Sequence, residues 1–83
     1  FSLAASDAQH DPSTCQLTAD YLAPLGITSL LEATLRRDGR LIGVVCHEHV
    51  GSARTWNADE ETFAYLLSRF VGLALSLDRR LLA

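Results

Sequence analysis

The chain has 83 residues, the size of one domain at most. Hydrophobic residues make up 48% of it, enough for a packed core, which excludes disorder as the default state. The net charge is −3 and the seven basic residues are scattered arginines, without the basic stripe that nucleic-acid binding requires. Two cysteines are too few for a secreted disulfide framework, so a reducing, cytoplasmic setting is expected. No apolar run reaches the length of a membrane span.

The first part of the chain predicts a strand followed by a helix. Residues 1–5 are short and apolar, and polar turn residues follow them, which favours a strand that runs out into a loop. Over residues 12–25 apolar side chains recur at helical spacing, so a short amphipathic helix is expected. Asp11 can cap its start, with Pro12 in the first turn, and Gly26 ends it.

The clearest local signal is a β-hairpin, in which residues 30–37 and 40–50 flank Asp38 and Gly39. An Asp-Gly pair supplies the positive φ angles of a two-residue type I′ turn. Regular pairing outward from that turn predicts a wholly apolar face of Leu31, Ala33, Leu35, Ile42, Val44 and Cys46. It predicts a mixed opposite face of Leu30, Glu32, Thr34, Arg36, Leu41, Gly43, Val45 and His47. A mixed face meets water or a ligand.

A long helix is expected over residues 58–82. Asn57 and Glu60 have the spacing of a capping box at its start. Apolar residues then follow at alternating steps of four and three, as in a core helix or a short coiled coil: Phe63, Leu67, Phe70, Ala74, Leu77 and Leu81. This seam should pack on the apolar face of the hairpin. The helix is longer than the strands, so its end should project beyond the sheet, which suits a partner helix or a connector to an output domain.

The resulting order, β-α-β-β-α, resembles the GAF domain, and the residues themselves carry the resemblance. They are Asp7-Ala8, Asp11-Pro12, Tyr21-Leu22-Ala23-Pro24-Leu25-Gly26-Ile27, Ser29-Leu30-Leu31, Asp38-Gly39-Arg40-Leu41-Ile42-Gly43-Val44-Val45, Glu48-His49-Val50-Gly51, Arg54, Trp56, Glu60 and Phe63. The resemblance implies a profilin-like α+β fold, an antiparallel sheet with flanking helices. The first helix and strands of that fold have no counterpart here, so residues 1–83 are expected to be the C-terminal part of a single GAF domain and an excised fragment.

The resemblance also implies a function. GAF domains are non-catalytic sensory or regulatory modules of larger signal-transduction proteins, here expected to be bacterial and cytoplasmic, with an output domain such as a histidine kinase or a diguanylate cyclase. The implied small-molecule pocket lies on the sheet face opposite the terminal helix. The candidate ligand-binding residues on the mixed face are Tyr21, Glu32, Thr34, Val45 and His47. The ligand and any cofactor are not identified by the sequence.

A structural alternative is a homodimerisation module without a ligand. In that hypothesis the C-terminal helices of two copies meet through Phe63, Leu67, Phe70, Ala74 and Leu77. A solvated half-sheet with no ligand is an equally ordinary interpretation of the mixed face.

Other chemistries are disfavoured. A cysteine-based redox enzyme of GAF fold would need Cys15 or Cys46, and the register buries Cys46 on the apolar face, where a thiol is inert. Covalent bilin binding in phytochrome-type GAF domains uses a Cys-His pair at positions that hold Leu17 and Thr18 here. The cyclic-nucleotide GAF domains use a lysine, which this chain lacks. The His47-Glu48-His49 stretch is more typical of surface histidines than of a metal site.

Overall fold

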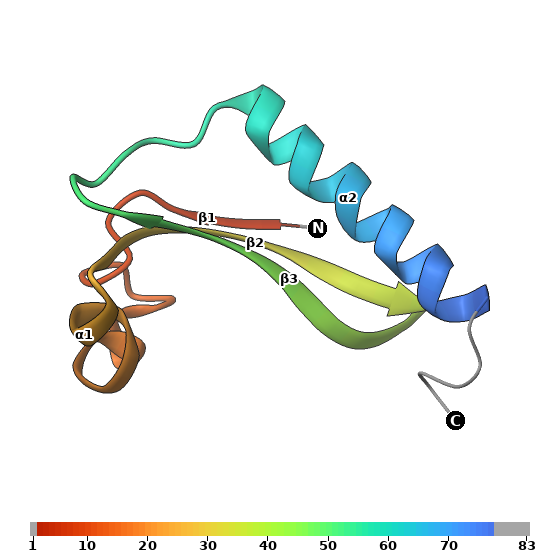
Figure 1. Cartoon of the computed structure of the whole chain (residues 1–83), viewed down its shortest axis with the longest axis horizontal. Helices are drawn as coiled ribbons and strands as arrows, with labels where there is room; N and C mark the ends of the chain where they lie inside the picture. Colours follow the sequence, from red (N-terminus) through yellow and green to blue (C-terminus); the bar gives the residue numbers. More distant parts are fainter. Residues whose placement is uncertain (1, 78–83) are drawn as a thin grey trace.

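The computed structural model describes residues 2–77, in which three strands form one antiparallel sheet of order β1–β2–β3. The strands are β1 (Ser2–Ala5), β2 (Ile27–Arg37) and β3 (Arg40–Val50). Helix α2 (Ala58–Leu77) lies across one face, and a run of short turns ending in α1 (Ala23–Leu25) lies at one end of the other face (Figure 1). The α+β class and the order β-α-β-β-α are confirmed. Residues 78–82 of the expected long helix, with Leu81, lie outside the described residues.

The β2–β3 hairpin turns as expected but carries a bulge. Asp38 and Gly39 have φ angles of 52° and 76°, which fit a type I′ turn. After two regular pairs beyond the turn, however, Leu35 pairs with Gly43, and Ile42 is an extra residue without a partner. The predicted register, which paired Leu35 with Ile42, is therefore wrong from this point onward. A shift of one residue sends every later β3 side chain to the opposite face.

The bulge defines two faces of the hairpin. The helix face, toward α2, carries Leu31, Ala33, Leu35, Gly43, Val45 and His47. The open face, on the opposite side, carries Leu30, Glu32, Thr34, Val44, Cys46 and Glu48. The β2 residues lie on the faces predicted for them. The β3 residues do not: Val44 and Cys46, expected in the core, lie on the open face, whereas Val45 and His47 lie under the helix.

Helix α2 meets the sheet through small side chains. Its buried residues are Ala64, Ser68 and Gly72, one on each successive turn. A Cβ atom at Gly72 would lie 2.8 Å from the carbonyl oxygen of Arg36, so the two backbones are in close contact there.

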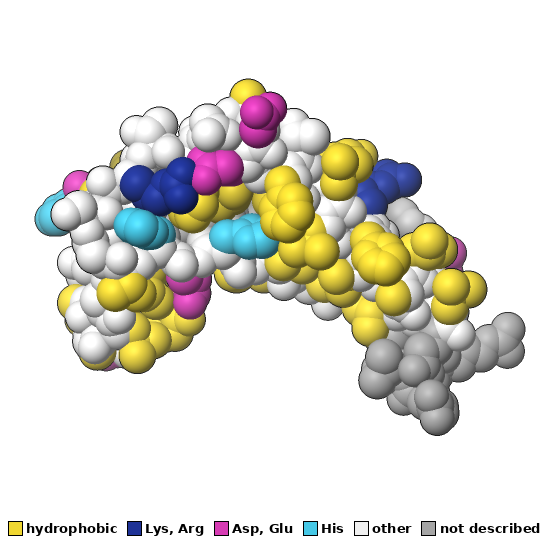
Figure 2. All heavy atoms as spheres, turned by 45° about the horizontal axis from the view of Figure 1, so that its top comes forward, with side chains coloured by type: hydrophobic (Ala, Val, Ile, Leu, Met, Phe, Trp, Pro, Cys, Tyr) yellow, Lys and Arg dark blue, Asp and Glu magenta, His cyan; other side chains and the backbone are white. Residues whose placement is uncertain are grey.

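The prediction that a seam of large apolar residues packs on the sheet is therefore wrong. Phe63, Phe70 and Leu77 are 61%, 65% and 77% exposed, Ala74 is exposed and Leu67 is half-buried. The helix approaches the strands too closely to leave room for large side chains between them, so these project to the flanks and outward. Figure 2 shows hydrophobic side chains gathered along this outer surface.

The start of α2 is held by the predicted capping box. The Asn57 N–H donates to Glu60 Oε1 at 2.9 Å, and the Glu60 N–H donates to Asn57 Oδ1 at 2.8 Å. The Arg54 guanidinium pairs with Glu60 and lies 4.6 Å from the centre of the Trp56 ring, which packs against the buried Leu31 cluster. The bond from the Asn57 N–H, followed by the Arg54 contact, lowers the pKa of Glu60.

The helix expected over residues 12–25 is instead three short turns: a 3₁₀ turn at Cys15–Leu17, a π turn at Thr18–Leu22, and α1. Threonine hydroxyls explain the irregularity, because Thr14 donates to the Ala8 carbonyl at 2.6 Å and Thr18 to the Gln9 carbonyl at 2.9 Å. Such side-chain bonds compete with a regular helix.

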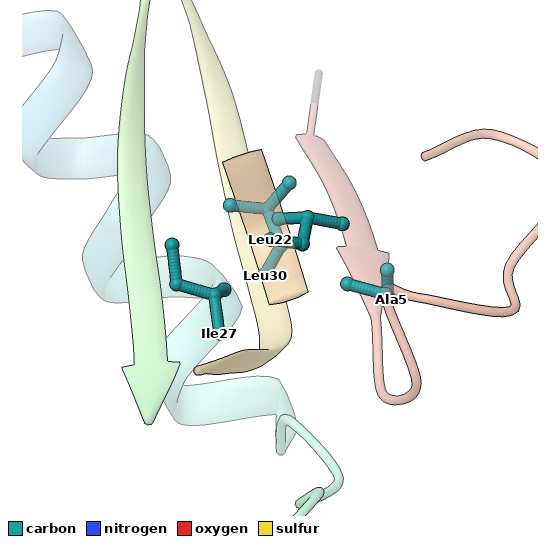
Figure 3. Close-up of a cluster of buried hydrophobic side chains, with 5 residues drawn as sticks. Ala5, Leu22, Ile27 and Leu30 are labelled. Atoms are coloured by element: carbon teal, nitrogen blue, oxygen red, sulfur yellow. The ribbon is translucent and has the colours of Figure 1, made fainter. Parts of the chain in front are cut away.

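The expected end of this segment is confirmed, since Gly26 has a φ of 71°. Leu22 is fully buried and anchors the turns on the sheet beside Ala5, Ile27 and Leu30 (Figure 3). Within the described part of the chain, no helix is long and apolar enough to cross a membrane.

Candidate functional site

Tyr21 links the short turns to the far strand of the sheet. Tyr21 belongs to the π turn, in which the next residue, Leu22, is buried in the core while the Tyr21 side chain stays exposed. Its hydroxyl donates a 2.6 Å hydrogen bond to Glu48 Oε2 of β3. That bond, then burial and the Glu48 charge, raises the pKa of Tyr21 above its ordinary value of 10.0. The phenol is therefore a protonated donor at neutral pH.

Glu32 and Cys46 form a second polar pair beside Tyr21 and Glu48 on the open face. They lie directly opposite each other on β2 and β3, and the Cys46 thiol donates to Glu32 Oε2 at 3.6 Å. Burial of the thiol, followed by the charge of Glu32, raises the pKa of Cys46 to about 11. The thiol stays protonated at neutral pH, and a protonated thiol is a poor nucleophile.

Apolar side chains adjoin these two polar pairs. Val44 lies two residues before Cys46 on β3 and is exposed, and Thr34 lies opposite Val44 in the ladder. A few fixed hydrogen-bonding groups set in apolar surface are the usual composition of a small-molecule site. The open face has that composition, and the turns between Cys15 and Leu25 border it at one end.

The predicted ligand-binding residues divide between the two faces. Tyr21, Glu32 and Thr34 lie together on the open face, whereas Val45 and His47 lie on the helix face and do not join them. Their role in binding remains a prediction. Glu48 and Cys46 were missed as site residues, because regular pairing from the turn placed Cys46 on the apolar face. Only the pattern around Gly43, a glycine inside a strand, hinted at a bulge.

His47 instead borders a hollow of about 310 Å³ between the sheet and the start of α2. Its ring centre lies 6.1 Å from that of Phe63. His47 Nε2 and Trp56 Nε1 are both buried without a hydrogen-bond partner among residues 2–77. Among the same residues, no three metal-ligating side chains come together, so the His47-Glu48-His49 stretch does not build a metal site within them.

Comparisons with known proteins agree with this fold. The GAF domain family model matches residues 2–75. The solved structure of the photoproduct state of GAF3 from Slr1393 of Synechocystis sp. PCC6803 is similar, with a TM-score of 0.81 and 23% sequence identity. The similarity covers 98% of this chain and 51% of that one, so the chain spans about half of its length. A search of curated proteins found no match. Because the family match covers nearly all of the chain, the chain belongs to the GAF domain family.

Proposed function

We propose that the chain is part of a non-catalytic sensory or regulatory GAF domain of a larger cytoplasmic signal-transduction protein, and that its open face binds a small molecule. The observation that carries the proposal is the Tyr21–Glu48 hydrogen bond of 2.6 Å. It places a donor and an acceptor together over exposed apolar residues, where a ligand can take over either group. Membership of a family of sensory and regulatory domains supports this assignment.

Strand β2 gives ligand binding a route to α2. Glu32 faces the open side, while its neighbours Leu31 and Ala33 are buried in the cluster that contains Ala64 of α2. A ligand that moves Glu32 therefore shifts the same strand segment that supports the helix. Such a ligand changes the population of α2 positions by as much as its affinities for them differ.

The state of Cys46 supports a binding role over catalysis. With its pKa raised to about 11, the thiol is almost entirely protonated at neutral pH and lacks the electropositive surroundings of a reactive cysteine. The charges of the neighbouring Glu32 and Glu48 carboxylates also raise the pKa of the Cys46 thiol.

The proposal is tested by a thermal-shift screen of the chain against nucleotides, amino acids, tetrapyrroles and phenolic acids. We expect at least one class to raise the unfolding temperature of the wild-type chain, and Tyr21→Phe and Glu48→Gln to lose the response. Glu61→Gln is the matched control, because it makes the same change in the first turn of α2, away from the open face. A response that survives in Tyr21→Phe and Glu48→Gln, or no response in the wild type, contradicts the proposal.

Dimerisation through α2 is a second candidate, favoured by the exposure of Phe63, Phe70 and Leu77 on its outer surface. If it is correct, light scattering of the wild type gives twice the chain mass, and Phe70→Glu and Leu67→Glu give the single-chain mass. Leu41→Glu is the control for Phe70→Glu, since Leu41 is 59% exposed, close to the 65% of Phe70, but lies at the hairpin tip. A wild type that is monomeric at all concentrations removes this candidate.

A further inference from the structure

A second hollow lies at the hairpin tip, between β2 and the flank of α2, and its volume is about 460 Å³. It is distinct from the Tyr21–Glu48 region, which lies toward the opposite end of the sheet (Figure 1). Its lining includes three arginines and one carboxylate among other residues: Arg36, Arg37, Arg69, Asp38, Tyr65 and Ser68. We call it the arginine groove.

Among residues 2–77, the side chains of Arg36 and Arg69 donate hydrogen bonds to neutral partners only. Arg36 Nη1 donates to the Gly39 carbonyl at 3.2 Å. Arg69 Nη1 donates to the Tyr65 hydroxyl at 3.4 Å, and its guanidinium lies 5.8 Å from the Tyr65 ring centre. The ion pairs found among residues 2–77 join other side chains, in a chain whose net charge is −3. Within the described part of the chain, positive charge is therefore concentrated here without an ion pair to a carboxylate.

The serine hydroxyls of the groove do not compete as donors. Ser68 donates to the Tyr65 carbonyl at 2.7 Å, and Ser76 donates to the Gly72 carbonyl at 2.9 Å, both within α2. The guanidinium groups therefore remain the principal donors. Their planar, forked geometry matches the paired oxygens of a phosphate or a carboxylate.

We propose that the arginine groove binds a compact polyanion, with phosphate or carboxylate oxygens held between Arg37 of the sheet and Arg69 of α2, and with Arg36 beside them. The bound anion joins the hairpin tip to the helix at the point where Gly72 meets the Arg36 backbone. The groove borders the open face, because Thr34 belongs to both, but this proposal does not depend on the ligand proposed for that face.

The test is a two-dimensional ¹H–¹⁵N NMR titration of the chain with inorganic pyrophosphate and, separately, with citrate, at constant ionic strength. We expect saturable shifts of the arginine Nε–H signals of Arg36, Arg37 and Arg69. Arg37→Gln and Arg69→Gln should each weaken binding by about tenfold or more, because each removes a charge-assisted hydrogen bond. The stronger of the two probes identifies the source as phosphate or carboxylate.

Arg40→Gln is the matched control, since it removes the same charge from the hairpin tip at a residue outside the groove lining. It should change the affinity by less than about twofold, the size expected for a screened surface charge. An equal loss in Arg40→Gln would mean general charge attraction and would overturn the proposal. Signal shifts that do not saturate, or that are confined to other residues, would also overturn the proposal. Thermal unfolding of each variant verifies that it is folded.

Discussion

The two faces of the β2–β3 hairpin are built in opposite ways. The helix face is closed by α2, whose small residues Ala64, Ser68 and Gly72 bring it against the strands. Within residues 2–77, the open face is covered at one end, where Leu22 anchors the short turns, and beyond them Val44 is 45% exposed. The comparison shows that close packing here depends on small side chains, while large apolar ones remain available at the surface.

The largest expected effect comes from comparing one apolar-to-alanine substitution on each face. Leu31→Ala should lower the free energy of unfolding by about 3 kcal/mol, because Leu31 is 2% exposed and its removal leaves a cavity under α2. Val44→Ala should cost less than about 1 kcal/mol, because that side chain is already half in water. Urea unfolding measures both values. Equal losses would mean that the open face is as closed as the helix face.

Gly72→Val tests the close approach of α2. Its first side-chain atom would lie 2.8 Å from the Arg36 carbonyl oxygen, which is backbone and cannot move aside cheaply. We expect a loss of about 1 to 3 kcal/mol by urea unfolding, the usual range for overpacking. Ala74→Val, an added side chain on an exposed position of the same helix, should lose only the helix-propensity difference of about 0.5 kcal/mol. A Gly72→Val chain as stable as the wild type would contradict the close contact.

The pH dependence of stability tests how the start of α2 is held. The pKa of Glu60 is lowered in the folded chain by the bond from the Asn57 N–H and by Arg54. Its contribution to stability is therefore complete above its unfolded pKa of about 4.3, and is lost as the pH falls through the lower folded value. Between pH 5 and pH 3 the wild type should lose more stability than Glu60→Gln. Glu61→Gln should keep the wild-type slope, and a parallel slope in Glu60→Gln would contradict the assignment.

Alkylation of Cys46 tests the open face directly, through a reaction rate rather than through stability. With a pKa of about 11, only about one thiol in a thousand is ionised at pH 8. In a Cys15→Ser chain, Cys46 should react with iodoacetamide about a hundredfold more slowly than free cysteine, whose pKa is about 8.5. Glu32→Gln should speed the reaction, because it removes an opposing charge. A rate equal to that of free cysteine would contradict the polar pairing on this face.

Much of the fold follows from local signals in the sequence. The Asp38-Gly39 turn, the Gly26 end of the first helical segment and the Asn57–Glu60 capping box are each set by residues within a few positions of one another. Such short-range chemistry does not depend on the rest of the fold, so it could be predicted.

The rest depended on contacts between distant segments. The spacing of Phe63, Phe70 and Leu77 indicated a buried seam, but these side chains are exposed, and Gly72 lies against the sheet instead. The periodicity of a helix does not determine how closely it approaches the sheet. The bulge at Ile42 was likewise invisible to regular pairing, so the candidate site was predicted on β2 and misassigned on β3. Tyr21 was identified, but its partner Glu48 was not.

The bulge at Ile42 also bears on how related chains can differ. Leu35 already pairs with Gly43, so deleting Ile42 would remove the bulge and leave every later pair unchanged. A chain that kept this residue in a regular ladder would instead exchange the two sets of β3 residues, because side chains alternate along a strand. Val45 and His47 would then face the open side, and Cys46 and Glu48 would turn toward α2. Two relatives of equal length, one with the bulge and one without it, could therefore share almost every residue and yet present different chemistry to a ligand.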